Sequence, residues 1–274
     1  MLPILFKAGP LTIYSWGFFL AASFLLATFI LWREGKRQGY NEERLLDLSI
    51  ICLLSALIGG RAFYILQNIN LFKGDSASIL YFWQGGFVYY GALLGVIIAA
   101  AYFIRAWKWS FFQIADIGAL ATNAALVLIK IGAFLAGIEI GKETNAAWAV
   151  KYPGFSFNRH PVQLYEAATY LIFLIFLYLL YFRNLASREM KSGKIFFTFL
   201  VITSIAQAIF ELYKEGQGTF FSWPKTSIFS FIIATTAVFA LYYFKIRNFR
   251  EDGQNLLKII TGSGRFLLHK IHLR

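Results

Sequence analysis

The feature that most constrains this chain is a series of seven apolar runs, each long enough to cross a lipid bilayer. A bilayer core of about 30 Å needs about 20 predominantly apolar residues in helical form. The runs are Leu11–Trp32, Leu46–Leu66, Gly86–Ile104, Phe111–Gly137, Val162–Phe182, Ile195–Tyr213 and Ile228–Phe244. They predict an all-α integral membrane protein, a bundle of about seven transmembrane helices.

The amino-acid composition also indicates a protein embedded in lipid. Of 274 residues, 58% are hydrophobic and only 15% are charged, whereas soluble domains are about 45–50% apolar and about 25% charged. A soluble fold this apolar would need a larger core than the chain can enclose. Aromatic residues reach 19%, and they suit lipid-facing surfaces and interfacial belts.

The net charge is +12, but the basic residues lie almost entirely between the apolar runs. Charge placed there sets membrane topology and attracts anionic lipid headgroups, so no nucleic-acid partner is expected. In the predicted topology 17 of the 26 Lys and Arg residues lie on one side and 7 on the other. The positive-inside rule then places the N-terminus outside and the C-terminus in the cytoplasm.

Two domains are expected along the chain. Residues 1–245 form the transmembrane domain, and residues 246–274 form a basic cytoplasmic tail, either amphipathic on the inner leaflet or simply solvated. The N-terminus is interpreted as a short leader into a retained span, since it lacks a charged n-region and a cleavage site. We find no internal repeat, which disfavours a transporter built from inverted repeats.

Few reaction types fit the remaining motifs. The single cysteine, Cys52, lies in an apolar run, which favours a buried hydrophobe over a catalytic thiol. No metal site and no cofactor are predicted. The sequence lacks a Gly-x-Ser-x-Gly elbow, a His-Glu-x-x-His pair and a P-loop, which disfavours hydrolases, metalloproteases and nucleotide-driven enzymes.

Ionisable side chains at bilayer depth are costly, so they are functional candidates unless they snorkel to the interface. They are Arg61, Asp116, Lys130, Glu139, Glu166 and Glu211. Glycines surround several of them, as in IGGRAFY, WQGGFVYYGALLG and KIGAFLAG. These glycines either let a second backbone approach the polar groups or serve tight helix packing alone.

The segment before the fifth run, ETNAAWAVKYPGFSFNRHPVQLYE, concentrates polar groups. Pro161 suits a helix start, which places Arg159 and His160 at the entrance of the helix. Gln163 and Glu166 are three residues apart and therefore share a face. Cations suit a phosphate ester, and Tyr and His can carry protons. We expect a metal-free transferase or binding protein that acts on an anionic lipid near the outer leaflet.

RHPVQLYE, residues 159–166, resembles the RHP-[ST]-QLYE signature of the prolipoprotein diacylglyceryl transferases. Four further blocks resemble segments of that family in the same order. They are IGGRAFY, GGFVYYGALLG, KIGAFLAGIEIGKET with WAVKYPG, and FELYKEG. The resemblance extends from about Gly9 to about Lys245.

The resemblance implies an enzyme of the bacterial inner membrane that acts without a cofactor. Its partners would be phosphatidylglycerol, the signal peptide of a preprolipoprotein with its lipobox cysteine, and the bilayer. The diacylglyceryl group would pass to the cysteine thiol, forming a thioether and releasing glycerol phosphate, in the first step of lipoprotein maturation. The alternative is a catalytically silent paralogue that binds lipid or lipoprotein precursors.

The resemblance also assigns roles to residues. The catalytic candidates are Tyr90, Lys130, His160 and Lys214. The substrate-binding candidates are Arg61, Tyr64, Asp116, Glu139, Arg159, Gln163, Tyr165, Glu166 and Glu211.

The chain departs from the family pattern at several of these positions. Lys130 and Lys214 stand where the family usually has arginines, and lysine lacks the bidentate fork of arginine. Glu139 lies one position from a usual carboxylate, and Ala133 and Ala136 replace polar or sulfur side chains. These departures leave open an active enzyme that uses lysines or a relative with altered substrate or lost activity.

Overall fold

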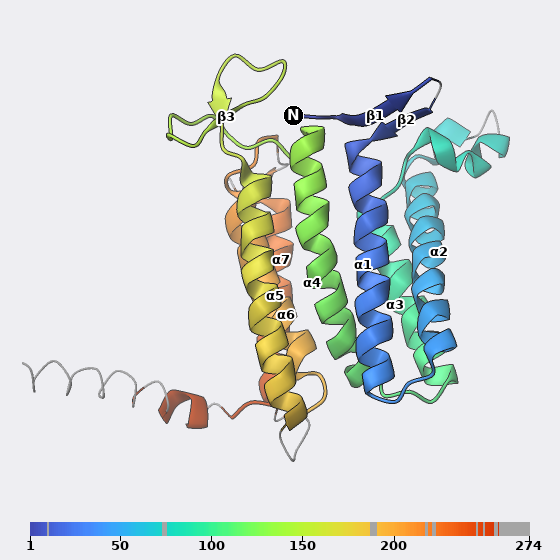
Figure 1. Cartoon of the computed structure of the whole chain (residues 1–274), viewed down its shortest axis with the longest axis vertical. Helices are drawn as coiled ribbons and strands as arrows, with labels where there is room; N and C mark the ends of the chain where they lie inside the picture. The colour runs from blue at the N-terminus through green and yellow to red at the C-terminus, as the bar shows by residue number, and fades with distance from the viewer. Residues whose placement is uncertain are drawn as a thin grey trace, which may run out of the picture. The chain divides into compact units, whose positions relative to one another are not determined.

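The computed structural model describes residues 1–9, 11–72, 76–186, 191–216, 219–220, 223–244, 246–248, 250–254 and 257. Within them lie seven helices long and apolar enough to cross a membrane (Figure 1). These are α1 (Ser15–Arg37), α2 (Glu42–Gln67), α3 (Tyr89–Ala106), α4 (Phe111–Ala136), α5 (Val162–Ala186), α6 (Lys194–Glu211) and α7 (Lys225–Tyr243). The prediction of a seven-helix, multi-pass membrane protein is therefore confirmed.

The start of the first run was predicted wrongly. Leu11–Tyr14 is not helical but forms strand β2, which pairs antiparallel with β1 (Ile4–Ala8). The backbone N–H of Ser15 donates to the carbonyl oxygen of Pro3 at 2.9 Å, so the hairpin closes where α1 begins. A short apolar stretch does not distinguish a strand from a helix by its periodicity alone.

Local signals account for several helix ends. The side chain of Asn41 accepts a hydrogen bond from the backbone N–H of Arg44 at 2.9 Å and thereby caps α2. Glu42 and Glu43 follow in the first turn, where carboxylates are favoured by the helix dipole. At the C-terminal end of α4, Gly137 adopts a left-handed conformation that terminates the helix.

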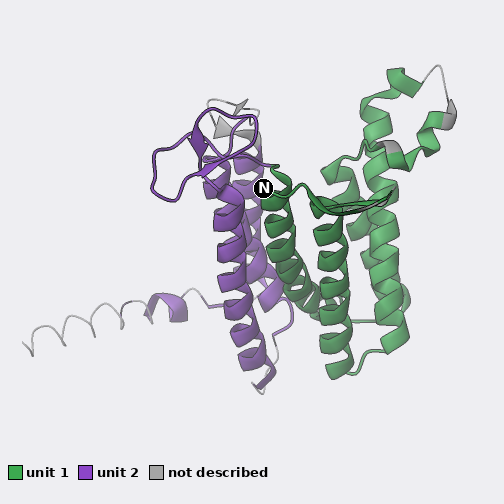
Figure 2. Ribbon diagram, turned by 45° about the horizontal axis from the view of Figure 1, so that its top comes forward, with its two compact units in different colours: residues 1–138 green, residues 139–274 purple. Residues whose placement is uncertain are grey.

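The chain divides into two compact units, residues 1–138 and 139–274, shown in green and purple in Figure 2. In the first unit α1 packs on α4, and α2 packs on α3. The α2–α3 contact depends on glycine: a Cβ added to Gly59 would lie 2.4 Å from the carbonyl oxygen of Gly91. Gly59 and Gly91 thus allow the backbones of α2 and α3 to approach closely.

A segment of three short 3-10 helices joins α2 to α3. They are η1 (Ile69–Phe72), η2 (Ser76–Leu80) and η3 (Phe82–Gln84). In the first unit this segment adjoins the end of α2 from which it emerges, as its teal colour in Figure 1 shows. It leads directly into Tyr89, the first residue of α3.

In the second unit α6 packs between α5 and α7. Two short antiparallel pairs accompany these helices, β3 (Val150–Lys151) with β4 (Asn158–Arg159), and β5 (Thr219–Phe220) with β6 (Trp223–Pro224). Most of the predicted amphipathic segment of the tail, residues 258–274, lies outside the described residues.

Candidate functional site

The residues of the RHPVQLYE segment converge where α5 begins. Pro161 immediately precedes Val162, the first residue of α5, as predicted. Arg159 is 5% exposed, and Gln163 and Glu166 are fully buried on one helix face. A guanidinium, an amide and a carboxylate thus lie together at the end of a transmembrane helix.

Both terminal nitrogens of the Arg159 guanidinium have hydrogen-bond partners. Its Nη2 donates to Glu143 Oε1 at 3.2 Å, and its Nη1 donates to Glu215 and to the carbonyl oxygen of Gly141, the latter at 3.2 Å. The guanidinium also lies 4.2 Å from the ring centre of Phe155. Both carboxylates are about half exposed, so an anion that bound Arg159 would compete with flexible side chains.

Lys214 lies at the centre of three carboxylates. Its Nζ is 3.0 Å from Glu139 Oε2, 3.0 Å from Glu166 Oε1 and 3.4 Å from Glu211 Oε2. Glu166 and Glu211 are buried, whereas the Glu139 side chain is 34% exposed. The carboxylates come from the segment after α4, from α5 and from the end of α6, so one ammonium links three parts of the second unit.

Two uncharged side chains extend this cluster into α5 and α6. Gln207 Nε2 donates to Glu211 Oε2 at 2.9 Å, and the Tyr170 hydroxyl donates to Gln207 Oε1 at 3.2 Å. Sequence reasoning missed both residues. Gln207 could have been found, because a residue four positions before Glu211 shares its helix face.

His160 belongs to an aromatic group at the same end of α5. Its Nδ1 lies 3.3 Å from the Tyr165 hydroxyl, which also accepts a hydrogen bond from Trp148 Nε1 at 2.7 Å. The Tyr165 hydroxyl therefore joins Trp148 to His160 in one hydrogen-bonded group. The Tyr213 ring packs edge-on to the imidazole at 5.6 Å. These contacts fix the orientation of the His160 imidazole.

The segment before α5 is fixed to the helix by a buried phenol. The Tyr152 hydroxyl donates to Gln163 Oε1 at 2.8 Å, and Tyr152 is only 1% exposed. Burial raises the pKa of the Tyr152 phenol, and the hydrogen bond to Gln163 offsets part of that rise. Tyr152 therefore acts as a neutral hydrogen-bond donor that keeps the amide of Gln163 in place.

Backbone hydrogen bonds join the segments that carry these side chains. Lys142 N donates to the Tyr213 carbonyl at 2.8 Å, and His160 N donates to the Lys142 carbonyl at 3.0 Å. A Cβ on Gly141 would lie 2.3 Å from the His160 carbonyl oxygen, so only glycine fits there. Three segments distant in sequence are thus held side by side, and they place Arg159, His160 and Lys214 in one unit.

A second set of buried polar residues lies on α4 of the first unit. Asp116 is 4% exposed and Lys130 is 6% exposed. Asn123, which sequence reasoning missed, is fully buried between them. The spacing of seven residues places all three on one helix face, and this periodicity was the available signal.

The remaining sequence candidates also belong to the first unit. Arg61 is 5% exposed and donates to backbone carbonyls, and its guanidinium lies 5.7 Å from the ring centre of Tyr64. Tyr90 is in the first turn of α3 and is 51% exposed. Of the predicted catalytic residues, Tyr90 and Lys130 are thus in residues 1–138, and His160 and Lys214 are in residues 139–274.

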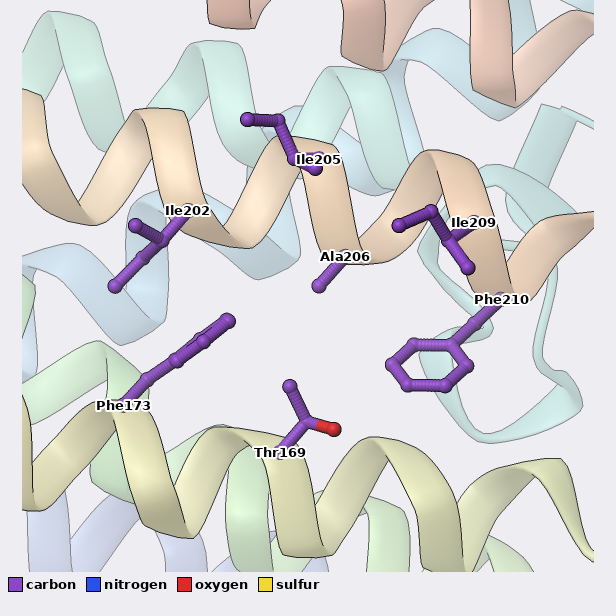
Figure 3. Close-up of a pocket in the computed structure, with 7 residues that line it drawn as sticks. All are labelled: Thr169, Phe173, Ile202, Ile205, Ala206, Ile209 and Phe210. Carbon is purple, nitrogen blue, oxygen red and sulfur yellow. The ribbon is translucent and has the colours of Figure 1, made fainter. Parts of the chain in front are cut away.

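An apolar pocket of about 260 Å³ lies between α5 and α6 (Figure 3). It is lined by Thr169, Phe173, Ile202, Ile205, Ala206, Ile209 and Phe210. Thr169 is three residues beyond Glu166 on α5, and Phe210 directly precedes Glu211 on α6. The pocket therefore begins where the buried polar cluster ends.

Among the described residues, no group of three or more His, Cys, Asp or Glu side chains is arranged to hold a metal ion. The polar groups present instead can bind an anion, accept a proton and orient a substrate. This chemistry fits a transfer reaction at a lipid headgroup.

Comparisons with known proteins agree with this description. A family model described as prolipoprotein diacylglyceryl transferase matches residues 3–244. A phosphatidylglycerol–prolipoprotein diacylglyceryl transferase of Clostridium tetani is 29% identical over 92% of this chain and 100% of its own length. Proteins of the same name from Geobacter sulfurreducens and Vibrio cholerae are 31% and 35% identical, over 78% and 64% of this chain and 82% and 66% of their own lengths.

Proposed function

This chain belongs to the prolipoprotein diacylglyceryl transferase family, and we propose that it transfers the diacylglyceryl group of phosphatidylglycerol to a prolipoprotein, the first step of lipoprotein maturation. The acceptor is the thiol of the lipobox cysteine in the signal peptide. The sulfur forms a thioether bond with the glyceryl carbon, the bond from that carbon to the phosphate oxygen breaks, and glycerol phosphate leaves. The observation that carries the proposal is the burial of Arg159, Gln163 and Glu166 beside Lys214 at one end of α5.

The reaction needs a base for the thiol, since a cysteine has a reference pKa of about 8.5. His160 is our candidate, because Tyr165 and Tyr213 orient its ring and its side chain is partly exposed. Tyr90 and Lys130 are further catalytic candidates on the strength of the family resemblance. The departing phosphate needs preorganised cations, which are the larger expected contribution to the rate.

Arg159 is the residue that we assign to the anionic headgroup. Its planar fork can bind two phosphate oxygens, as it binds two carboxylates in the free protein. Binding would exchange Glu143 and Glu215 for the phosphate, and their half-exposed side chains can turn toward water. Lys214 would hold Glu139, Glu166 and Glu211 in fixed positions in the same unit.

The pocket between α5 and α6 supports a lipid substrate. Because α6 rises about 1.5 Å per residue, the pocket runs about 12 Å along the helix from Ile202 to Phe210. That length approaches the depth of one leaflet, about half of the 30 Å hydrocarbon core. We propose that one acyl chain of the donor lies here, with its headgroup toward the end of α5 next to Arg159.

The proposed setting is the bacterial inner membrane, with the N-terminus outside and residues 246–274 in the cytoplasm. The distribution of Lys and Arg in the sequence supports this orientation. Residues 1–245 would then form the complete transmembrane domain, and the reaction would occur at the outer leaflet.

An assay in lipid nanodiscs tests the function. Purified protein is mixed with phosphatidylglycerol and a lipobox peptide, and thioether product is followed by mass spectrometry. Wild-type protein should form product. Arg159→Ala should lower the rate at least about tenfold, because it removes the guanidinium that we expect to donate two hydrogen bonds to the phosphate. Arg105→Ala, at an exposed position on α3, is the matched control. No product from folded wild-type protein would disprove the transferase.

A silent, lipid-binding paralogue is the second candidate, and the three carboxylates around Lys214 favour it because they offset its charge. This candidate predicts that Lys130→Arg and Lys214→Arg together create activity that the wild type lacks. If the wild type already forms thioether product, the second candidate is excluded.

A further inference from the structure

We propose that Arg61 is a positioning residue that clasps the segment between α2 and α3, and that it does not bind the lipid headgroup. The family resemblance places Arg61 among the substrate-binding residues, but its contacts in this structure are of another kind. The consequence for catalysis rests on the proposed transferase function.

Among the described residues, every hydrogen bond that the Arg61 guanidinium donates ends on a backbone carbonyl. Nε donates to Ile79 at 3.1 Å, and Nη2 donates to Ser78 at 2.7 Å. Nη1 donates to Gly85 at 2.6 Å and to Gly86 at 3.4 Å. One side chain on α2 thereby joins η2 to the residues that follow η3.

The fork geometry is what makes this arrangement possible. Arginine presents five N–H donors in one plane, whereas lysine presents three donors on a single atom. Arg61 is 5% exposed, and the dipoles of the carbonyl groups that it contacts stabilise its positive charge. A phosphate that took the place of these carbonyls would leave buried acceptors unpaired, which is costly.

Further contacts support the clasp, by which we mean the hydrogen bonds from Arg61 to the carbonyl groups of residues 78, 79, 85 and 86. Val88 N donates to the Gly60 carbonyl at 3.0 Å, and the Arg61 guanidinium lies 5.6 Å from the ring centre of Phe72. Gly86 has a φ of +77°, and a Cβ there would lie 2.5 Å from the Tyr64 ring. The segment therefore packs closely against α2, and these contacts require the backbone conformation that it has at Gly86 and Val88.

This path determines where α3 begins. Val88 is the N-cap of α3, and Tyr89 and Tyr90 are its first two residues. Because residues 85–88 are bound to Gly60 and Arg61, the clasp fixes the position of the Tyr90 side chain, a catalytic candidate. Loss of the clasp should therefore affect turnover more than binding of the headgroup.

The test compares Arg61→Lys and Gly86→Ala in nanodiscs. Arg61→Lys keeps the charge but loses the fork, and Gly86→Ala keeps the arginine but pushes the segment away from Tyr64. We expect both to lower kcat at least about tenfold, to change KM for phosphatidylglycerol less than about twofold, and to raise amide hydrogen exchange over residues 78–88. These expectations follow from the loss of several buried hydrogen bonds to a charged group.

Two matched controls accompany them. Arg105→Lys makes the same substitution at an exposed position of α3. Gly39→Ala introduces a side chain at a comparable φ of +84° with nothing within 4 Å. Both should leave kcat and exchange over residues 78–88 unchanged.

The proposal is overturned if Arg61→Lys raises KM with normal exchange over residues 78–88, or if both variants behave like the controls. If either variant fails to fold, the other decides the result. If wild-type protein forms no product, the transferase function fails, and the exchange measurement still decides whether Arg61 holds the segment. The two failures are therefore distinguishable.

Discussion

The ammonium of Lys214 lies 3.0 Å from the carboxylate of Glu166, and these side chains are 4% and 0% exposed. A second ion pair, Lys36 with Glu42, has a similar distance of 2.8 Å, but its side chains are 54% and 46% exposed. The two pairs differ mainly in burial, which makes them a natural comparison. Removing one partner of a buried pair leaves an uncompensated charge, whereas exposed pairs contribute little.

The first prediction concerns stability. Lys214→Ala should lower the free energy of unfolding by about 3–5 kcal/mol, because Glu166 and Glu211 lose their buried counter-ion. Lys36→Ala should change it by less than about 1 kcal/mol. Denaturant titration of both variants in mild detergent measures the difference. Equal losses would mean that the Lys214 cluster contributes no more than a surface pair.

The second prediction concerns the two carboxylates on Arg159. Glu143→Gln with Glu215→Gln should lower KM for phosphatidylglycerol about fivefold, because the guanidinium no longer has to release two anions. Glu42→Gln, which also removes an exposed carboxylate from an ion pair, should leave KM unchanged. Steady-state kinetics in nanodiscs provide the measurement. A raised KM would show that the carboxylates assist headgroup binding.

The third prediction concerns the acyl chain. Ala206→Phe places a ring in the pocket between α5 and α6 and should raise KM for long-chain phosphatidylglycerol about tenfold, since crowding the acyl chain against that ring costs about 1–3 kcal/mol. A short-chain donor should be affected less. Ala168→Phe places the same side chain on an exposed part of α5 outside the pocket, and it should be neutral. A diazirine-labelled acyl chain offers an independent readout, because it should crosslink to residues 202–210 in the wild type.

The fourth prediction concerns alkaline pH. Burial raises the pKa of Tyr152 above its ordinary value of about 10. Above that ordinary value the unfolded chain loses this proton while the folded protein keeps it, so stability falls as pH rises. The contribution is complete below about pH 10 and is lost as pH passes through the raised pKa.

Tyr152→Phe tests this directly. It should cost about 1 kcal/mol at neutral pH through loss of the hydrogen bond to Gln163, and it should weaken the decline in melting temperature above about pH 10. Tyr14→Phe, at a residue that is 60% exposed, is the control and should leave the pH profile unchanged. An unaltered profile in Tyr152→Phe would assign the alkaline transition to another group.

Hydrophobic length alone determined the number of spans, because a bilayer sets a minimum length for every helix that crosses it. Local chemistry also placed the start of α5, since a proline is favoured at a helix start and disfavoured in a helix interior. The first span was misjudged at Leu11–Tyr14, because hydrogen bonds to Ile4–Ala8 make that stretch a strand. Such pairing depends on a second segment and not on the apolar residues themselves.

The partners of the buried cations were decided by tertiary structure. Arg159 meets Glu215, which is 56 residues away, and Lys214 meets Glu139, which is 75 residues away. Arg61 uses carbonyls of a segment that follows it by 17 to 25 residues. The sequence by itself determined which charges lie in the apolar helices. Only the folded chain decided what neutralises them, because a buried charge is compensated by whichever distant groups the packing brings within a few ångströms.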